Sequence, residues 1–292
     1  MSAASSTALG LRMPRGRAPQ RLVRVALILL VLAIFLLPLW TLAMTALSGA
    51  TLQSGEAALL PKQPTFSNIT TAWHFGVARG LVNSLIVVAV GLTLQVTVSA
   101  LAAYSLARKR FRGASLVLLV LLATMMMPEE IIAIPLYLVL GKIPQPFTGG
   151  TLIDSYGGLI LPLVGWALPI YVLTGFMRTI PIELEEAARI DGAGDFGIFW
   201  RVILPLCRPA LGTCGVFGFL MIWDQYLLPL LVAQSKNTYT LTLVVTSLQS
   251  SEELGEGVRL AAALILLVPS VIVYLLLQRF FERGLLSGSL KG

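Results

Sequence analysis

Long runs of apolar residues without any charge constrain this sequence more than any other feature. Four such runs occupy residues 25–47, 81–107, 155–177 and 260–278. Two more runs, 113–140 and 209–235, are interrupted only by acidic residues. Each run reaches or exceeds the roughly 18 to 20 residues that a helix needs to cross about 30 Å of hydrocarbon.

The backbone in these runs has to satisfy its own hydrogen bonds, because the bilayer core supplies no water. A transmembrane β-barrel would show segments of alternating polarity, whereas these runs are apolar on every face. The sequence therefore predicts an all-α integral membrane protein with six transmembrane helices. We expect a basic tail over residues 1–24, a single transmembrane domain over 25–292, and a loop at 178–208 between helices four and five.

The basic residues predict how the chain is oriented. If the N-terminus is cytoplasmic, sixteen of the 21 Lys and Arg residues fall inside and five outside. This asymmetry follows the positive-inside rule and places both termini in the cytoplasm. Membrane insertion also explains the net charge of +7, so no nucleic-acid partner is expected. A cleaved signal peptide is a poorer explanation of the first run, which is longer than the ~7 to 15 residues of a signal-peptide core.

The loop at 178–208 carries the signals of a short helix. We expect this helix to begin at Thr179 or Ile180, with Pro181 in its first turn, where proline is tolerated. Three glutamates follow near the positive end of the helix dipole: Glu183, Glu185 and Glu186. Gly192 is expected to end the helix.

One face of this predicted helix carries two alanines, where a helix that packs on its own protein would normally present Leu or Ile. At helical spacing it presents Leu184, Ala187, Ala188 and Asp191. Small side chains allow another backbone to come close, which suits docking into a groove of a partner protein. The alternative is an amphipathic helix on the membrane surface, although such a helix would carry basic residues where this one has glutamates.

The same segment contains a motif with a defined spacing. It reads Glu186-Ala187-Ala188, three residues, Gly192, nine residues and then Val202-Ile203-Leu204-Pro205. This pattern resembles the EAA loop of the permease subunits of binding-protein-dependent ABC importers, although that family usually has Ile at the position of Val202. The stretch from Phe176 to Ala210 is similar to the carbohydrate branch, the class of the second maltose permease subunit. Weaker similarity extends along nearly the whole chain.

The resemblance implies a permease subunit that takes up a sugar or sugar-like solute by alternating access across the bacterial inner membrane. It implies a second permease subunit as heterodimer partner, two ATPase subunits, an extracytoplasmic solute-binding protein and surrounding lipid. The residues that it assigns to ATPase coupling are Glu186, Ala187, Ala188, Asp191, Gly192 and Pro205.

No enzyme activity or bound cofactor is expected of the chain itself. A P-loop requires a glycine five residues before Gly-Lys, and at Gly141-Lys142 that position is Leu136. ATP and Mg²⁺ would therefore be used by the partner ATPase subunits. No metal site is expected either, because the usual ligands are limited to Cys207, Cys214 and His74.

Acidic residues inside the predicted spans indicate a polar path. An intramembrane carboxylate costs about 2.5 to 3.5 kcal/mol and normally faces a cavity or a partner. Counted along straight helices, Glu129 and Asp224 both lie ~21 to 23 Å from the cytoplasmic ends. The substrate-path candidates are Glu129, Glu130, Trp223, Asp224, Gln225 and Tyr226. The importer family commonly has Asn and then an acid after the tryptophan, so Asp224-Gln225 departs from its pattern.

Four explanations of these acids remain open on the sequence. They could contact a sugar, form hydrogen bonds between helices, form a gate without substrate contact, or face the partner permease. A different class of protein, a proton-coupled secondary carrier, would use Glu129, Glu130 and Asp224 as a proton relay. The absence of a detectable inverted repeat weakens that alternative.

Overall fold

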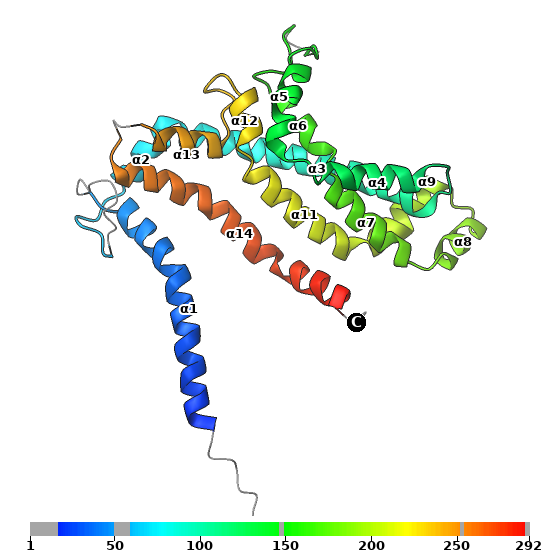
Figure 1. Ribbon diagram of the computed structural model, residues 1–292, viewed down its shortest axis with the longest axis horizontal. Coiled ribbons are helices and arrows are strands. Elements are labelled where there is room, and N and C mark those ends of the chain that lie inside the picture. The colour runs from blue at the N-terminus through cyan, green and yellow to red at the C-terminus, as the bar shows by residue number, and fades with distance from the viewer. Residues whose placement is uncertain (1–16, 50–58, 146–148, 252–253, 290–292) are drawn as a thin grey trace, which may run out of the picture.

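A computed structural model describes residues 17–49, 59–145, 149–251 and 254–289 of the chain. Most of the predicted basic tail at 1–24 lies outside these residues. Within them every regular element is helical, and extended pairing is limited to the isolated bridges Ser48–Pro64 and Pro144–Thr151. The predicted all-α fold is confirmed (Figure 1).

The helices divide into a few continuous stretches. The first half of the chain contains α1 (Arg17–Ala46), α2 (Ser67–Ala72), the π-helix η1 (Trp73–Val77), α3 (Ala78–Arg108), α4 (Ala114–Thr124) and α5 (Glu129–Leu140). The middle contains α6 (Tyr156–Val164), α7 (Ala167–Thr179), α8 (Glu183–Ile190), α9 (Asp195–Ile198), the π-helix η2 (Phe199–Ile203) and α10 (Leu204–Leu206). The last part contains α11 (Arg208–Trp223), α12 (Leu227–Val232), α13 (Leu241–Gln249) and α14 (Glu256–Ser289).

Four of the described helical stretches are long and apolar enough to cross a membrane: Arg21–Ala46, Ser67–Arg108, Tyr156–Thr179 and Glu256–Gln278. Two further pairs qualify only together, α4 with α5 and α9–α10 with α11. The count reaches the predicted six only if each bent pair is taken as one span.

The third predicted span, 113–140, is not one helix. The axes of α4 and α5 differ by 105°, and Met125–Pro128 form the break between them. Proline disfavours helical geometry in the residue before it and has no N–H to continue the helical hydrogen bonds. Pro128 itself has a non-helical ψ of 137°, and α5 begins directly after it. Depth counted along a straight helix therefore does not apply to Glu129.

The fifth predicted span, 209–235, is also interrupted. α11 ends at Trp223, and α12 begins after a short turn. The side chain of Gln225 accepts a hydrogen bond from the backbone N–H of Tyr226 at 3.0 Å, which supports this turn. Pro229 then falls in the first turn of α12, where the missing N–H has no helical partner to lose.

α3 is the central helix, because it contacts α4, α6, α7, α11 and α13. Its first half contributes Val87 and Val88 to one buried core with α6, α11, α13 and α14. Its second half contributes Ala100 and Ala103 to another buried core with α7 and η2. This second core supports the end of the molecule that carries α8 (Figure 1).

α1 is the least covered of the candidate spans. None of its most apolar window is buried against the rest of the chain. α1 contacts α14 and otherwise extends away from the other helices (Figure 1). Apolar surface of this kind is stable in lipid or against another transmembrane helix, where it makes no contact with water.

The loops before α6 and after α12 are joined through Asp154. Its carboxylate accepts hydrogen bonds from the backbone N–H groups of Gln234 and Ser235, both at 3.0 Å, and from the hydroxyl of Thr238. Burial alone would raise the pKa of Asp154, but these hydrogen bonds outweigh it and lower the pKa below its usual value. These polar contacts therefore hold the loop before α6 against the loop after α12.

Candidate functional site

The helix predicted in the 178–208 loop is present as α8, with a later start than expected. α7 continues to Thr179, and Pro181 keeps Ile180 extended, with ψ 129°. The helix then begins at Glu183, so the prediction that Thr179 or Ile180 begins it is wrong. Pro181 ends the preceding helix and does not lie in the first turn of α8.

The end of α8 agrees with the prediction. Gly192 has φ +84°, which is accessible to glycine at little cost. Its N–H bonds to the carbonyl of Arg189 at 3.0 Å, and the N–H of Ala193 bonds to the carbonyl of Ala188 at 2.9 Å. These two bonds form a Schellman motif, which satisfies carbonyls at the helix end.

The side chains of α8 are mostly exposed. After the role predicted from the sequence, we name the following exposed residues the coupling surface: Leu184, Glu186, Ala187, Ile190, Asp191 and Gly192. Ile190 is 87% exposed, more than any other large hydrophobic residue in the described part of the chain. Ala188 turns inward and packs on the second core. Pro205 is not part of this surface, since it lies in α10 at the 77° bend before α11.

A buried ion pair attaches α8 to α3. Glu185 Oε1 lies 2.8 Å from Arg108 Nε, although the two groups are not aligned as a hydrogen bond. The side chains are only 1% and 7% exposed. Arg108 Nη2 also donates to the carbonyl of Ile180 at 2.6 Å, and Glu185 Oε2 lies 3.9 Å from Arg189 Nη2. Removing one member of such a pair leaves an uncompensated buried charge, so the pair fixes α8 relative to α3.

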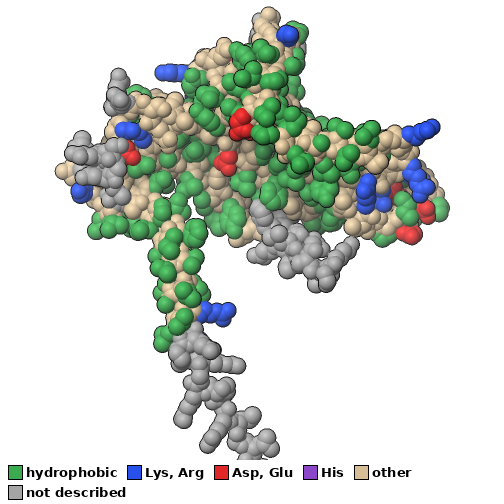
Figure 2. Space-filling model, in the orientation of Figure 1, with side chains coloured by type: hydrophobic (Ala, Val, Ile, Leu, Met, Phe, Trp, Pro, Cys, Tyr) green, Lys and Arg blue, Asp and Glu red, His purple; other side chains and the backbone are tan. Residues whose placement is uncertain are grey.

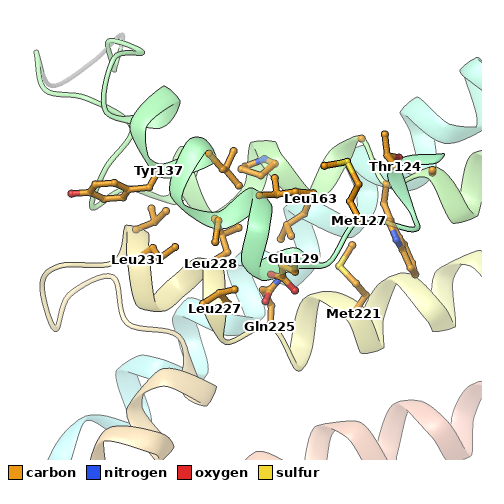
Figure 3. Close-up of a pocket in the computed structure, with 18 of the residues that line it drawn as sticks. Thr124, Met127, Glu129, Tyr137, Leu163, Met221, Gln225, Leu227, Leu228 and Leu231 are labelled. Carbon is orange, nitrogen blue, oxygen red and sulfur yellow. The ribbon is translucent and has the colours of Figure 1, made fainter. Parts of the chain in front are cut away.

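A pocket of about 330 Å³ lies between α5, the α6–α7 junction and the α11–α12 turn (Figure 3). We name it the translocation pocket, after the substrate path that the sequence predicts for Glu129 and Gln225. Its lining is mainly apolar and includes three methionines, Met125 and Met127 from the α4–α5 break and Met221 from α11. Glu129 and Gln225 lie beside each other near the middle of the view, between Tyr137 on the left and Thr124 on the right (Figure 3). A concave apolar site with a few polar groups is typical of small-molecule binding.

The structure brings together two of the six substrate-path candidates. Glu129 and Gln225 line the translocation pocket, whereas Glu130, Asp224 and Tyr226 are exposed outside its lining. Trp223 is buried: its indole N–H donates to the carbonyl of Leu266 at 3.2 Å, and its ring stacks on Phe219 at 5.6 Å.

Trp166 enters the pocket from the break between α6 and α7. Gln95 of α3 supports this break, because its amide donates to the carbonyl of Leu163 at 2.7 Å. Gln95 is fully buried, and its Oε1 has no hydrogen-bond partner among the described residues.

The comparison with known protein families decides what this architecture is. The family profile described as binding-protein-dependent transport system inner membrane component matches residues 95–287. The chain belongs to this family. The matched region includes the coupling surface, the buried Arg108–Glu185 pair and the whole lining of the translocation pocket.

Individual relatives agree with this membership. The permease is 34% identical over 272 residues to the diacetylchitobiose uptake system permease protein NgcG of Streptomyces coelicolor, covering 91% of this chain and 87% of the relative. It is 34% identical over 273 residues to the sn-glycerol-3-phosphate transport system permease protein UgpE of Yersinia pestis, covering 88% and 94%. It is 32% identical over 235 residues to the probable ABC transporter permease protein YurM of Bacillus subtilis, covering 80% and 76%.

A solved structure shares the fold of the permease. The chain matches a bacterial ABC transporter involved in the import of the acidic polysaccharide alginate, with a TM-score of 0.79 and 22% sequence identity. The match covers 92% of this chain and 99% of the other. At this identity the comparison supports the arrangement of helices and leaves the solute open.

Three contributors to the site lack a clear sequence signal. In the sequence, Arg108 is one of several basic residues that follow the positive-inside rule, and Gln95 is a single amide within an apolar run. Trp166 follows a glycine within a span, which could have indicated a helix break. Their roles depend on which helices become neighbours.

Proposed function

We propose that the permease is one of two membrane subunits of an ATP-driven importer and moves a sugar or sugar-like solute by alternating access. ATP and Mg²⁺ are used by two separate ATPase subunits, and an extracytoplasmic binding protein delivers the solute. Both termini lie in the cytoplasm. Family membership and the names of the relatives support the transporter class, and NgcG and UgpE are named for uptake of a disaccharide and a polyol phosphate.

The coupling surface is the observation that carries this proposal. Its alanine and glycine residues leave space for another protein, while Ile190 would lose its large exposed apolar area on docking. The Arg108–Glu185 pair then transmits a displacement of α8 to α3, the helix that contacts most of the bundle. A membrane surface alone would not suit the exposed acidic residues Glu186 and Asp191, since helices that lie on it usually carry basic residues.

Substitution of Ala187 tests the coupling role directly. Ala187 is exposed, so Ala187→Trp should leave the fold intact but prevent close docking of an ATPase subunit. We expect loss of solute uptake and reduced recovery of the ATPase subunits with the tagged permease. Lys236→Trp, also exposed but in the loop after α12, is the control and should retain both. Normal uptake by Ala187→Trp would refute the coupling assignment.

The exposed apolar surface of α1 supports the presence of a second permease subunit. Its apolar window is uncovered by its own chain, and α4 also contains no buried residue. We propose that the partner permease covers part of this apolar surface and that lipid covers the rest. Uptake that required only this chain and its ATPase would contradict the heterodimer.

The translocation pocket supplies the proposed solute contacts. Glu129 and Gln225 can accept hydrogen bonds from hydroxyl groups, and Trp166 and Tyr137 offer aromatic faces to sugar rings. A volume of about 330 Å³ lies near the lower end of the usual range for small-molecule sites.

Two neighbouring glutamates test this contact. Glu129→Gln removes the charge that lines the pocket, and we expect the KM for uptake to rise about tenfold, which equals the ~1.5 kcal/mol of a hydrogen bond to a charged group. Glu130→Gln removes the same charge one residue away, outside the pocket lining, and should change KM less than twofold. Equal effects of the two variants would argue against solute contact by Glu129.

The proton-coupled carrier is not favoured by the family match. It predicts uptake in vesicles that follows a pH gradient in the absence of ATP. The importer predicts no uptake under those conditions.

A further inference from the structure

A second pocket lies at the end of the molecule that carries α8. It has a volume of about 490 Å³ and is formed where α3 ends, α4 begins and α7 ends. We name it the basic pocket, because four of its lining residues are cationic: Lys109, Arg110, Arg112 and Arg178. Basic side chains also gather at this end in Figure 2.

The cations of the basic pocket exceed the acids available to them. Lys109 is paired with Asp195 at 2.5 Å. In the described part of the chain, neither Arg110 nor Arg112 forms an ion pair, and Arg178 makes only a long 3.4 Å hydrogen bond to the carbonyl of Leu106. Guanidinium groups bind phosphate oxygens through paired hydrogen bonds, so the pocket is suited to a phosphate group.

An apolar surface begins directly beside these cations. Phe111 lines the pocket and is exposed, and α4 starts three residues later at Ala114. α4 has no buried residue, and its exposed side chains include Leu116 and Leu119. Figure 2 shows hydrophobic side chains over this part of the molecule. A free phosphate would use only the cations, whereas a phospholipid would also use the apolar helix.

We propose that the basic pocket binds the headgroup of an anionic phospholipid, with its acyl chains along α4. The phosphate would contact Arg110, Arg112 and Arg178, and the chains would cover the exposed leucines. Because α4 and α7 both start or end here and also contribute to the translocation pocket, the lipid would hold together two helices of the transport path. This inference requires the membrane location but not the coupling role of α8.

Lipid selectivity of the purified assembly tests the proposal. The permease, with the subunits that purify with it, is reconstituted in phosphatidylcholine vesicles containing spin-labelled phosphatidylglycerol or spin-labelled phosphatidylcholine. We expect the wild type to prefer phosphatidylglycerol. The double variant Arg110→Gln/Arg112→Gln should lose at least fivefold of that preference, since about 1 kcal/mol per basic residue corresponds to about fivefold.

A matched control removes the same charge elsewhere. Arg21→Gln/Arg24→Gln alters two exposed arginines of α1, which the charge distribution places on the same side of the membrane. This control should retain the preference. An equal loss in both double variants would show general attraction to an anionic surface and would overturn the site, as would no loss in the pocket variant.

Further measurements distinguish a phospholipid from the other possible occupants of the basic pocket. Excess inorganic phosphate should leave the preference for phosphatidylglycerol unchanged, because phosphate lacks acyl chains. Loss of the preference in excess phosphate would assign the pocket to a free anion and overturn the lipid proposal. Loss of ATPase subunits without any change in preference would assign the pocket to a protein contact instead. The charge-conserving Arg110→Lys/Arg112→Lys should behave like wild type, and the single Gln variants replace the double one if it cannot be recovered.

Discussion

The coupling surface and the translocation pocket differ in how the chain builds them. The six residues of the coupling surface lie within nine consecutive positions, 184–192, and their helix is ended by local backbone bonds at Gly192. The translocation pocket collects side chains from α4, α5, α6, α7, α11 and α12 and depends on breaks between them. The proposed docking surface is thus local in the sequence, whereas the proposed solute path is assembled at helix breaks. Substitutions in the two regions should therefore have different effects on stability and uptake.

The largest effect is expected at the attachment of α8. Glu185→Leu leaves Arg108 buried without its main partner, which costs about 3 to 5 kcal/mol of stability. We expect a much lower thermal midpoint of the purified assembly and loss of coupled uptake.

Two further variants show whether this effect arises from the ion pair. Glu183→Gln changes an exposed glutamate of the same helix and should alter stability by less than about 0.5 kcal/mol. Arg108→Met/Glu185→Leu removes both charges and should recover much of the loss. If the double variant were as unstable as Glu185→Leu, packing and not charge would hold α8.

An intermediate effect is expected at the support of the pocket. Gln95→Leu removes the hydrogen bond to the carbonyl of Leu163 and leaves that carbonyl without this donor, at a cost of about 1 to 3 kcal/mol. Solute affinity should fall because the α6–α7 break that presents Trp166 is no longer held.

Solute binding and thermal unfolding of the same sample measure both consequences. Thr93→Val is the control on α3, since Thr93 is exposed and bonds only within its own helix, to the carbonyl of Ala89. Unchanged affinity in a destabilised Gln95→Leu would limit Gln95 to a role in folding.

The smallest effect is expected at the end of α8. Gly192→Val places a β-branched residue at φ +84°, and such a conformation costs about 1 to 2 kcal/mol. A Cβ there would meet no atom within 4 Å, so the cost comes from the backbone alone. We expect weaker stimulation of ATP hydrolysis by solute.

Glycine two residues further on provides the matched control. Gly194 also has open space around it but has φ −74°, so Gly194→Val carries no left-handed strain. Gly192→Asn should be nearly silent, because Asn tolerates positive φ. Comparable defects in Gly192→Val and Gly194→Val would show that added bulk, and not the helix end, matters.

The solvent physics of the bilayer explains why so much of the fold could be predicted. Uncharged runs of about twenty residues must be helices, and the helix end at Gly192 follows from a local backbone preference. The breaks were harder to predict, because Pro38 and Pro269 lie inside continuous helices, whereas Pro128 lies in the break before α5. Proline permits a bend in a transmembrane helix, and the neighbouring helices decide whether it occurs.

By itself the sequence determined the helical class, the membrane location, the family motif and the exposed acidic helix, because these depend on composition and on residues close together in the chain. Only the tertiary structure decided that Arg108 pairs with Glu185, that Gln95 supports the break beside Trp166, and that Glu129 shares a pocket with Gln225 while Trp223 does not. The physical reason is that a charge or an amide in an apolar span has to find a partner, and a linear pattern shows the need but not which helix meets it.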